Sequence, residues 1–247
     1  MGYTDSSYVA RIRRKYNEIR QIWDRADRWH ARVRQEIEEE IRLVEKDFAL
    51  IHTSKSVVID VGSAGNSYFE PRCLRIDVDV ADRSLFGALH AVCANAEMLP
   101  FRRQSADLIL CVGPVINYCS LDEVVSELAS VTKPSGILVL HVELSNSWEY
   151  LGTRAWRTDV AFVRSFYKGA EDYWVYSDSY VRRALATYGF SIARVRYFHM
   201  LSSLAYRITG QANLSAPLAW ADVFFRQLPF CGSIADSAIF VARREGL

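Results

Sequence analysis

Two patterns of apolar and polar positions divide the chain. Between residues 7 and 51, apolar side chains recur every three or four positions, which places them on one face of a helix. From residue 57 onward, short β-branched runs alternate with turns and helical stretches. The sequence therefore predicts an α/β protein with an N-terminal helical cap. The apolar stripe of that cap comprises Trp29, Val33, Ile37, Ile41, Val44 and Phe48.

Seven apolar runs fit the strands of one mostly parallel sheet. They are residues 57–61, 73–79, a run that ends before Asn95, 105–113, 137–143, 191–199 and 234–243. A helix with a capping box, Ser120 to Glu123, follows the fourth run, and a helix from residue 178 or 179 ends at Gly189. Residues 144–177 and 200–230 lie between these elements as insertions, the first rich in aromatic side chains and the second apolar and helical.

The first strand leads into the stretch that organises the rest of the chain. Its β-branched run contains Asp60 and is followed by a loop of small residues that extends to Asn66. Small residues let the backbone approach a ligand closely. No Lys follows Gly65 until far downstream, so a phosphate-binding P-loop is disfavoured. A dinucleotide fingerprint is disfavoured too, because Ala64 and Ser67 stand at its second and third glycine positions.

A third kind of loop fits better. Residues 60–64, Asp-Val-Gly-Ser-Ala, resemble the S-adenosylmethionine loop of class I methyltransferases, with Ala64 and Asn66 as departures. Residues 95–101, Asn-Ala-Glu-Met-Leu-Pro-Phe, resemble the segment after the third strand in that family, with Asn95 in place of Asp. Residues 133–136, Lys-Pro-Ser-Gly, resemble the turn before the fifth strand. The resemblance is continuous in order and spacing from Val57 to Glu143.

This resemblance implies a Rossmann-like seven-stranded methyltransferase sheet over residues 52–247, preceded by the cap at 1–51. It also implies S-adenosylmethionine as cofactor, with Asp77 as first choice for the ribose hydroxyls, Asp79 as second, and Asn95 at the adenine amino group. The short distance between Gly62 and Asp77 predicts a truncated first helix. The implied cofactor residues are Asp60, Gly62, Ser63, Ala64, Gly65, Asp77, Asp79, Asn95, Ala96, Glu97, Cys111, Val112 and Gly113.

The resemblance leaves the acceptor and its catalytic groups open. His141 and Glu143 point the same way at the end of the fifth strand, and Tyr118 follows the fourth, so each is a candidate base or a structural hydrogen-bonding group. His30 could approach from the cap. Aromatic segments on both sides of the site favour a small, partly apolar molecule or a peptide end. The predicted substrate-facing residues are Tyr16, Trp23, Tyr150 and Trp156, although packing of these rings on the sheet or among themselves explains them as well.

Composition narrows the partners further. Thirty Lys and Arg against 29 Asp and Glu give a net charge of +1, so no single-sign field is present to hold a nucleic acid. The five cysteines are scattered and lack metal-site spacing, and the polar start shows no signal peptide, which together favour a cytoplasmic protein. No apolar run is long enough for a membrane helix.

We therefore expect transfer of a methyl group to an O or N nucleophile of a small molecule or peptide end. By analogy this is the natural-product branch of the family. The departures Ala64, Asn66 and Asn95 motivate an alternative, a catalytically silent cofactor-binding partner subunit. An NAD-dependent reductase is a second alternative, weakened by the missing glycines. The oligomeric state is left open.

Overall fold

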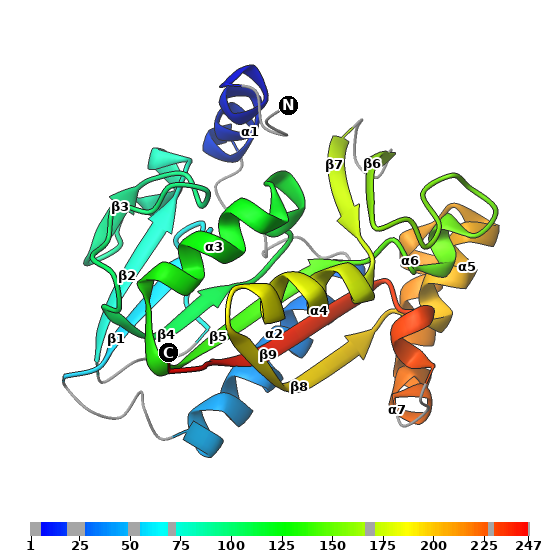
Figure 1. Ribbon diagram of the computed structural model, residues 1–247. Helices are drawn as coiled ribbons and strands as arrows, with labels where there is room; N and C mark the ends of the chain where they lie inside the picture. The colour runs from blue at the N-terminus through cyan, green and yellow to red at the C-terminus, as the bar shows by residue number, and fades with distance from the viewer. Residues whose placement is uncertain are drawn as a thin grey trace.

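A seven-stranded sheet forms the centre of the molecule in the computed structural model, which describes residues 6–18, 28–48, 55–68, 73–165, 171–226 and 230–246 (Figure 1). The strand order is β3-β2-β1-β4-β5-β9-β8, and β9 alone runs antiparallel to its neighbours. This confirms the predicted class. The strands are β1 (Val57–Val61), β2 (Leu74–Asp79), β3 (Ala91–Cys93), β4 (Ala106–Cys111), β5 (Thr132–Glu143), β8 (Phe190–Phe198) and β9 (Ser237–Arg244).

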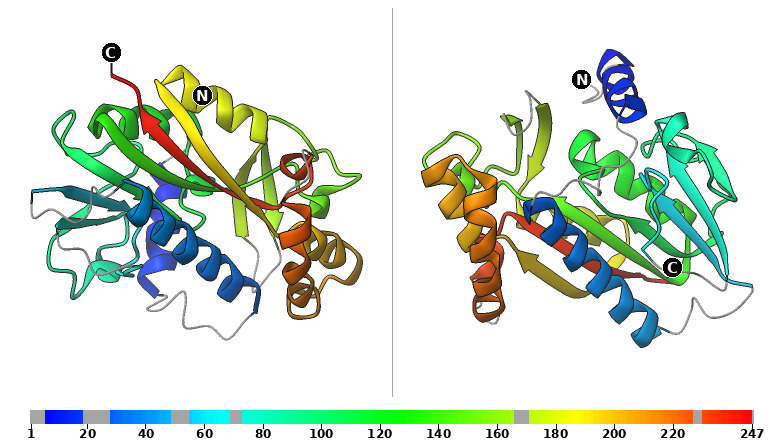
Figure 2. Two further views of the ribbon diagram at one scale, coloured as in Figure 1. Left: turned by 90° about the horizontal axis from the view of Figure 1, so that it is seen from below. Right: turned by 180° about the vertical axis from the view of Figure 1, so that it is seen from behind.

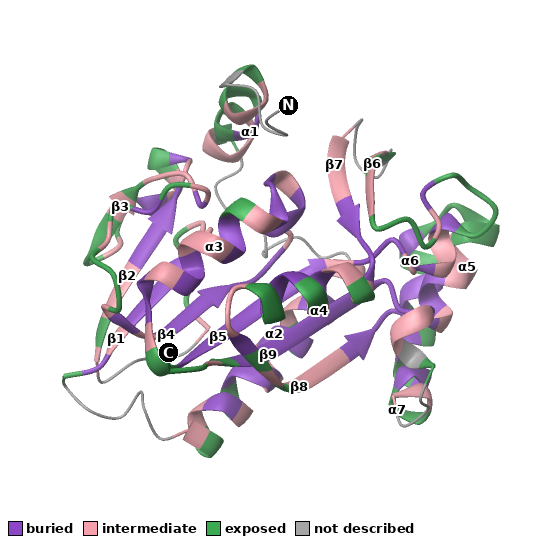
Figure 3. Cartoon of the chain, viewed as in Figure 1, coloured by how far each residue is buried: buried purple, intermediate pink, exposed green. Residues whose placement is uncertain are grey.

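Helices cover both faces of the sheet, as a mostly parallel sheet requires. Helices α3 (Leu121–Val131) and α4 (Asp178–Thr187) pack on one face, while α2 (Arg28–Phe48) crosses the other (Figure 2). The central strands are consequently buried along most of their length (Figure 3). Gly189, with φ of +74°, ends α4 at the predicted position. Between β1 and β2, the described residues contain no helix, in line with the expected truncation.

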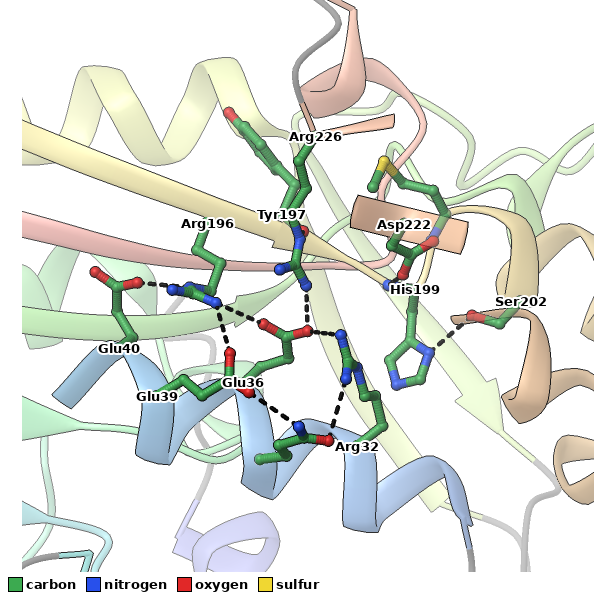
Figure 4. Close-up of polar contacts among 12 residues, drawn as sticks. Arg32, Glu36, Glu39, Glu40, Arg196, Tyr197, His199, Ser202, Asp222 and Arg226 are labelled. Atoms are coloured by element: carbon green, nitrogen blue, oxygen red, sulfur yellow. Dashed lines mark hydrogen bonds and ion pairs between the residues drawn. The ribbon is translucent and has the colours of Figure 1, made fainter. Parts of the chain in front are cut away.

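Helix α2 is bound to the sheet by its apolar stripe and by a buried ionic network. Val33, Ile37, Ile41 and Val44 pack against the inner residues of β4, β5 and β9. The completely buried carboxylates of Glu36 and Glu40 face a group of arginines (Figure 4). Arg32 belongs to α2 itself, and the later part of the chain supplies Arg194, Arg196 and Arg226.

Helix α1 (Ser6–Glu18) has a different environment. It lies beyond the carboxyl ends of the strands, beside a two-stranded sheet of β6 (Val160–Ser165) and β7 (Glu171–Tyr176) (Figure 1). Arg13 pairs with Asp82 at 3.0 Å, Arg11 pairs with Asp172 at 3.1 Å, and the Tyr8 hydroxyl donates to the Asp172 carbonyl at 2.9 Å. The predicted cap is therefore two helices in separate places. Residues 19–27 and 49–54, including Trp23 and the predicted boundary at residue 51, lie outside the described residues.

The second insertion is helical, as expected, and packs beside β8 and the start of α2 (Figure 1). It consists of α5 (Leu201–Thr209), α6 (Ala212–Ser215) and α7 (Asp222–Phe225). Short 3-10 segments lie at Asp82–Leu85, Ile116–Tyr118, Trp148–Tyr150, Ala216–Ala221 and Cys231–Ser233. In the part of the chain that the structure describes, no helix combines the length and apolarity needed to cross a bilayer.

Candidate active site

A pocket opens at the carboxyl ends of β1, β2 and β4, where the strand order reverses between β1 and β4. Ligands of open α/β sheets bind at this switch point. The space within the pocket is about 830 Å³ when the part open to solvent is counted. Its floor is the loop after β1, its sides follow β2, β3 and β4, and α1 forms its roof through Val9, Ile12 and Tyr16.

The loop after β1 takes a backbone shape that favours glycine. Gly62, Ala64 and Gly65 all have positive φ, at +73°, +48° and +70°. A Cβ on Gly62 would lie 2.2 Å from a methyl of Val115, and one on Gly65 would lie 2.2 Å from the Ser84 carbonyl oxygen. Both glycines are therefore required. Ala64 keeps the left-handed conformation at a modest steric cost, so the loop retains its shape although the glycine of the family pattern is absent.

Asp79 is the acidic residue on the pocket wall. Its Oδ2 accepts from the Ala64 amide at 2.9 Å and its Oδ1 accepts from the Ala81 amide at 2.8 Å, which fixes the carboxylate across the loop. Burial raises the pKa of Asp79, and these backbone hydrogen bonds oppose the shift. An ionised carboxylate has about four lone-pair sites, so Asp79 retains room to accept two hydroxyls of a ligand.

Asp77, the first choice for the ribose role, lies away from the wall. The Arg75 guanidinium reaches Asp77 at 2.6 Å and Asp60 at 3.0 Å, and it also donates to the Asn66 carbonyl. Burial raises the pKa of Asp60 to about 7, although Arg75 lowers it. The Arg75 guanidinium therefore links Asp60 of β1, Asp77 of β2 and the loop after β1. The sequence analysis missed Arg75, because its neighbours come from separate segments.

Asn95 lies on the opposite side of the pocket, after β3. Its side-chain oxygen accepts from the Glu97 amide at 3.2 Å, and its amide nitrogen donates to the Glu97 carboxylate at 3.2 Å. The same carboxylate accepts from the Ser120 amide at 2.7 Å. Ser120 begins α3 but makes no side-chain capping bond, so the predicted capping box is wrong and Glu97 takes its place. Glu97 therefore positions Asn95 from behind the wall.

The predicted cofactor residues divide into two groups. On the wall are Gly62, Ala64, Asp79, Asn95, Ala96, Val112 and Gly113. Asp60, Ser63, Asp77 and Cys111 are buried and do not line the pocket, and neither do the exposed Gly65 and the half-buried Glu97. The sequence analysis missed Val9 and Ile12 as wall residues, although the helical spacing of Tyr8, Ile12 and Tyr16 was visible in the sequence.

The catalytic candidates lie in different places. Tyr118 lines the pocket beside Tyr16, with 5.8 Å between the ring centroids. His141 is buried on the α2 side of the sheet, stacked on Phe198, and burial lowers its pKa to about 4. Neither His141 nor His30 lines the pocket, although the His141 ring interacts with the backbone of the wall residue Gly113.

The remaining candidates lie beyond the end of β5. Burial raises the pKa of Glu143 well above its usual range, and the nearby carboxylates of Asp236, Glu149 and Glu171 reinforce the shift. Tyr150 packs with Val175 and Trp156 in a separate cluster, away from the pocket wall. The structure thus leaves Tyr118 and Tyr16 at the pocket and places the other described candidates elsewhere.

The wall suits a nucleoside cofactor. Asp79 and Asn95 present acceptor oxygens from two neighbouring strands, and the apolar residues Val80 and Ala96 line the same pocket. A carboxylate with free lone pairs matches paired ribose hydroxyls, and apolar walls match the faces of a base. Asp79, the β1 loop and Asn95 are therefore the residues that would hold S-adenosylmethionine.

Comparisons with known proteins agree with this geometry. Residues 70–140 match the family model described as a methyltransferase domain. A malonyl-[acyl-carrier protein] O-methyltransferase of Methylovorus sp. is 30% identical over 152 residues, which is 53% of this chain and 49% of that protein. The chain thus spans about half the length of the curated relative it matches.

Two solved structures share the fold. The 1,6-didemethyltoxoflavin-N1-methyltransferase of Burkholderia thailandensis, solved with its substrate and S-adenosylhomocysteine, superposes with a TM-score of 0.57 at 12% identity, covering 98% of this chain and 91% of that one. The [4+2]-cyclase SpnF superposes with a TM-score of 0.52 at 17% identity, covering 85% and 82%. The matched segment, the sheet order and the pocket at its switch point make this chain similar to class I S-adenosylmethionine-dependent methyltransferases.

Proposed function

We propose that this protein transfers a methyl group from S-adenosylmethionine to an O or N nucleophile of a small molecule or peptide end in specialised metabolism. The observation that carries the proposal is that Asp79, Asn95 and the β1 loop line one pocket at the carboxyl ends of the adjacent strands β1, β2 and β3. When bound, S-adenosylmethionine supplies a methyl group made electrophilic by its sulfonium. The protein's own task is to place the acceptor in line and to exclude water.

The chain's residues divide this task. Asp79, the β1 loop and Asn95 bind and orient the cofactor. Val9, Ile12 and Tyr16 cover the pocket from above and exclude water. Tyr16 and Tyr118 stand at the same end of the pocket, where their rings meet edge to face and would bound the acceptor. Tyr118 donates its hydroxyl hydrogen to Glu171, which fixes the ring against β7.

O-methyl transfer to a carrier-bound malonyl group, the reaction in the name of the curated relative, is a second candidate. Sequence similarity over half of each chain favours it. The Glu171 carboxylate opposes it, because it lies against the Tyr118 hydroxyl at this end of the pocket and would repel an acidic acceptor. The superposition on a cyclase also shows that the fold by itself does not establish methyl transfer, so a silent partner subunit stays a further alternative.

Calorimetry with S-adenosylhomocysteine, S-adenosylmethionine and NAD tests the proposal. We expect the two sulfur ligands to bind and NAD not to bind. Asp79→Asn should weaken S-adenosylhomocysteine at least tenfold, about 1.4 kcal/mol, because a charge-assisted acceptor is lost. The matched variant Asp77→Asn should leave that affinity within about threefold. Equal losses in both variants, or preferential binding of NAD, would contradict the assignment. Binding without methyl transfer to any acceptor in a metabolite and peptide screen would favour the silent partner.

A further inference from the structure

An ammonium ion of the protein itself occupies a site beside the pocket. The Lys15 Nζ contacts Glu171 Oε1, and the Tyr118 hydroxyl donates to the same oxygen. The same ammonium lies 5.3 Å from the centroid of the Tyr16 ring and 5.8 Å from that of Tyr118. Both distances are within the range in which a cation is attracted to an aromatic face. Tyr16 and Tyr118 also line the pocket.

The surroundings of this site are aromatic and acidic. Tyr173 extends the ring cluster, with 6.4 Å between its centroid and that of Tyr118. Glu143 lies on the same side and has its pKa raised by burial and by Glu171. Lys15 is the cation that contacts Glu171 within the described residues. A carboxylate between aromatic rings is the arrangement that recognises alkylammonium ions, and it disfavours carboxylates and phosphates.

We propose that the methyl acceptor carries an amine, bound as its ammonium ion by Glu171 between Tyr16 and Tyr118, at the position that Lys15 Nζ now occupies. The inference rests on the proposed function, because it assigns the acceptor class of the same pocket. Lys15 then acts as an internal occupant that the acceptor displaces. The side chain can withdraw, since it is 35% exposed and α1 contacts the rest of the protein mainly through polar groups at its surface.

Three probes with one carbon skeleton test the charge preference: n-pentylammonium, 1-pentanol and pentanoate. Calorimetry on the full chain, with and without S-adenosylhomocysteine, should show binding in the order ammonium, alcohol, carboxylate. Lys15→Ala should bind pentylammonium at least tenfold more tightly than the wild-type protein, because no internal ammonium competes. Adding Glu171→Gln to Lys15→Ala should reverse at least that gain. Arg14→Ala is the matched control on α1, because Arg14 is an exposed cation of the same helix and Lys15, not Arg14, contacts Glu171, so it should leave pentylammonium binding unchanged.

The outcomes separate this inference from simpler accounts. The inference is overturned if the three probes bind equally, or if Glu171→Gln leaves the affinity for pentylammonium unchanged. It is also overturned if pentylammonium binds to Lys15→Ala but not to the wild-type protein in the presence of S-adenosylhomocysteine. Lys15 would then be a fixed structural partner of Glu171. If the double variant does not fold, the probe order in Lys15→Met decides. Failure of S-adenosylhomocysteine to bind would contradict the proposed function, whereas the probe order would still be measurable.

Discussion

The two N-terminal helices are adjacent in sequence and differ in almost every structural respect. Helix α2 buries four aliphatic residues and two glutamates against the sheet. Helix α1 has Ile12 as its buried apolar residue and contacts its neighbours through ion pairs whose arginines are about half exposed. The difference indicates that α2 stabilises the fold, whereas α1 completes the pocket. Burial stabilises much more than exposed ion pairs do.

The largest expected effect tests the ionic attachment of α2. Glu36→Gln leaves Arg32, Arg196 and Arg226 around a neutral side chain at a completely buried position. Breaking a buried network in this way should lower the free energy of unfolding by about 3–5 kcal/mol, measured by urea denaturation. The matched variant on α1 is Arg11→Gln, which removes the pair with Asp172 and should cost less than about 1 kcal/mol. Similar losses in both variants would remove the distinction between the helices.

Apolar contacts give the next comparison. Ile37→Ala should lower the free energy of unfolding by about 2–5 kcal/mol, because Ile37 is fully buried between α2 and the sheet. Ile12→Ala removes the same atoms from the pocket roof, where the side chain faces space rather than core. We expect a smaller loss of stability there and a weaker affinity for S-adenosylhomocysteine. Thermal unfolding and calorimetry on both variants measure the two effects, and an unaltered affinity in Ile12→Ala would count against the roof.

Acid should lower the free energy of unfolding through two buried histidines on the α2 side of the sheet. Burial lowers the pKa of His141 to about 4 and that of His199, which stacks on Trp29 of α2, to about 3. An unfolded histidine takes up its proton near pH 6.5, so the unfolded chain binds more protons as the pH falls below that value. This contribution to stability is present above pH 6.5 and is lost as the pH falls toward 4. Between these pH values each such histidine lowers the free energy of unfolding by ~1.4 kcal/mol per pH unit, because the unfolded chain binds one more proton. His141→Gln should remove one of these contributions, which urea titrations at several pH values would measure as a smaller slope. An unchanged slope would show that His141 does not titrate this way.

Removing α1 completes the comparison. Deletion of residues 1–18 should leave the urea midpoint nearly unchanged, because the helix adds little to the core. The same deletion should weaken S-adenosylhomocysteine at least tenfold, about 1.4 kcal/mol, because Val9, Ile12 and Tyr16 leave the pocket wall. Circular dichroism confirms folding and calorimetry gives the affinity. Retained affinity would show that α1 is dispensable for binding.

Local patterns were enough to predict the strands, the β1 loop and α2. Each of these depends on spacing within a short segment, and the segment after β3 repeats a recognisable order of residues. The acids of β2 could not be separated in the same way, because Asp77 and Asp79 share one strand face. Their difference comes from Arg75, which pairs with Asp77, and from the loop amide of Ala64, which binds Asp79.

The sequence also did not predict where an element lies relative to segments that are distant in the chain. The spacing of α1 predicted a helix, but its place over the pocket depends on Asp82 and Asp172, far away in sequence. The aromatic side chains of residues 144–177 predict packing among themselves or contact with a substrate, and neither interpretation specifies the β6–β7 hairpin. Phe162 packs on Trp174 and on Tyr8 of α1, whereas Tyr173 packs on Tyr118 beside the pocket.

The ionic network beneath α2 also bears on the order in which the chain becomes buried during synthesis. Glu36 and Glu40 pair with arginines 154 to 190 residues later in the sequence, and the stripe beside them packs on β9, the last strand. Contacts of such long sequence separation form slowly and only after the distant segment exists. Helix α2 therefore leaves the ribosome well before the segments that cover it. Its apolar face remains available to chaperones, or to aggregation, until β9 has been synthesised.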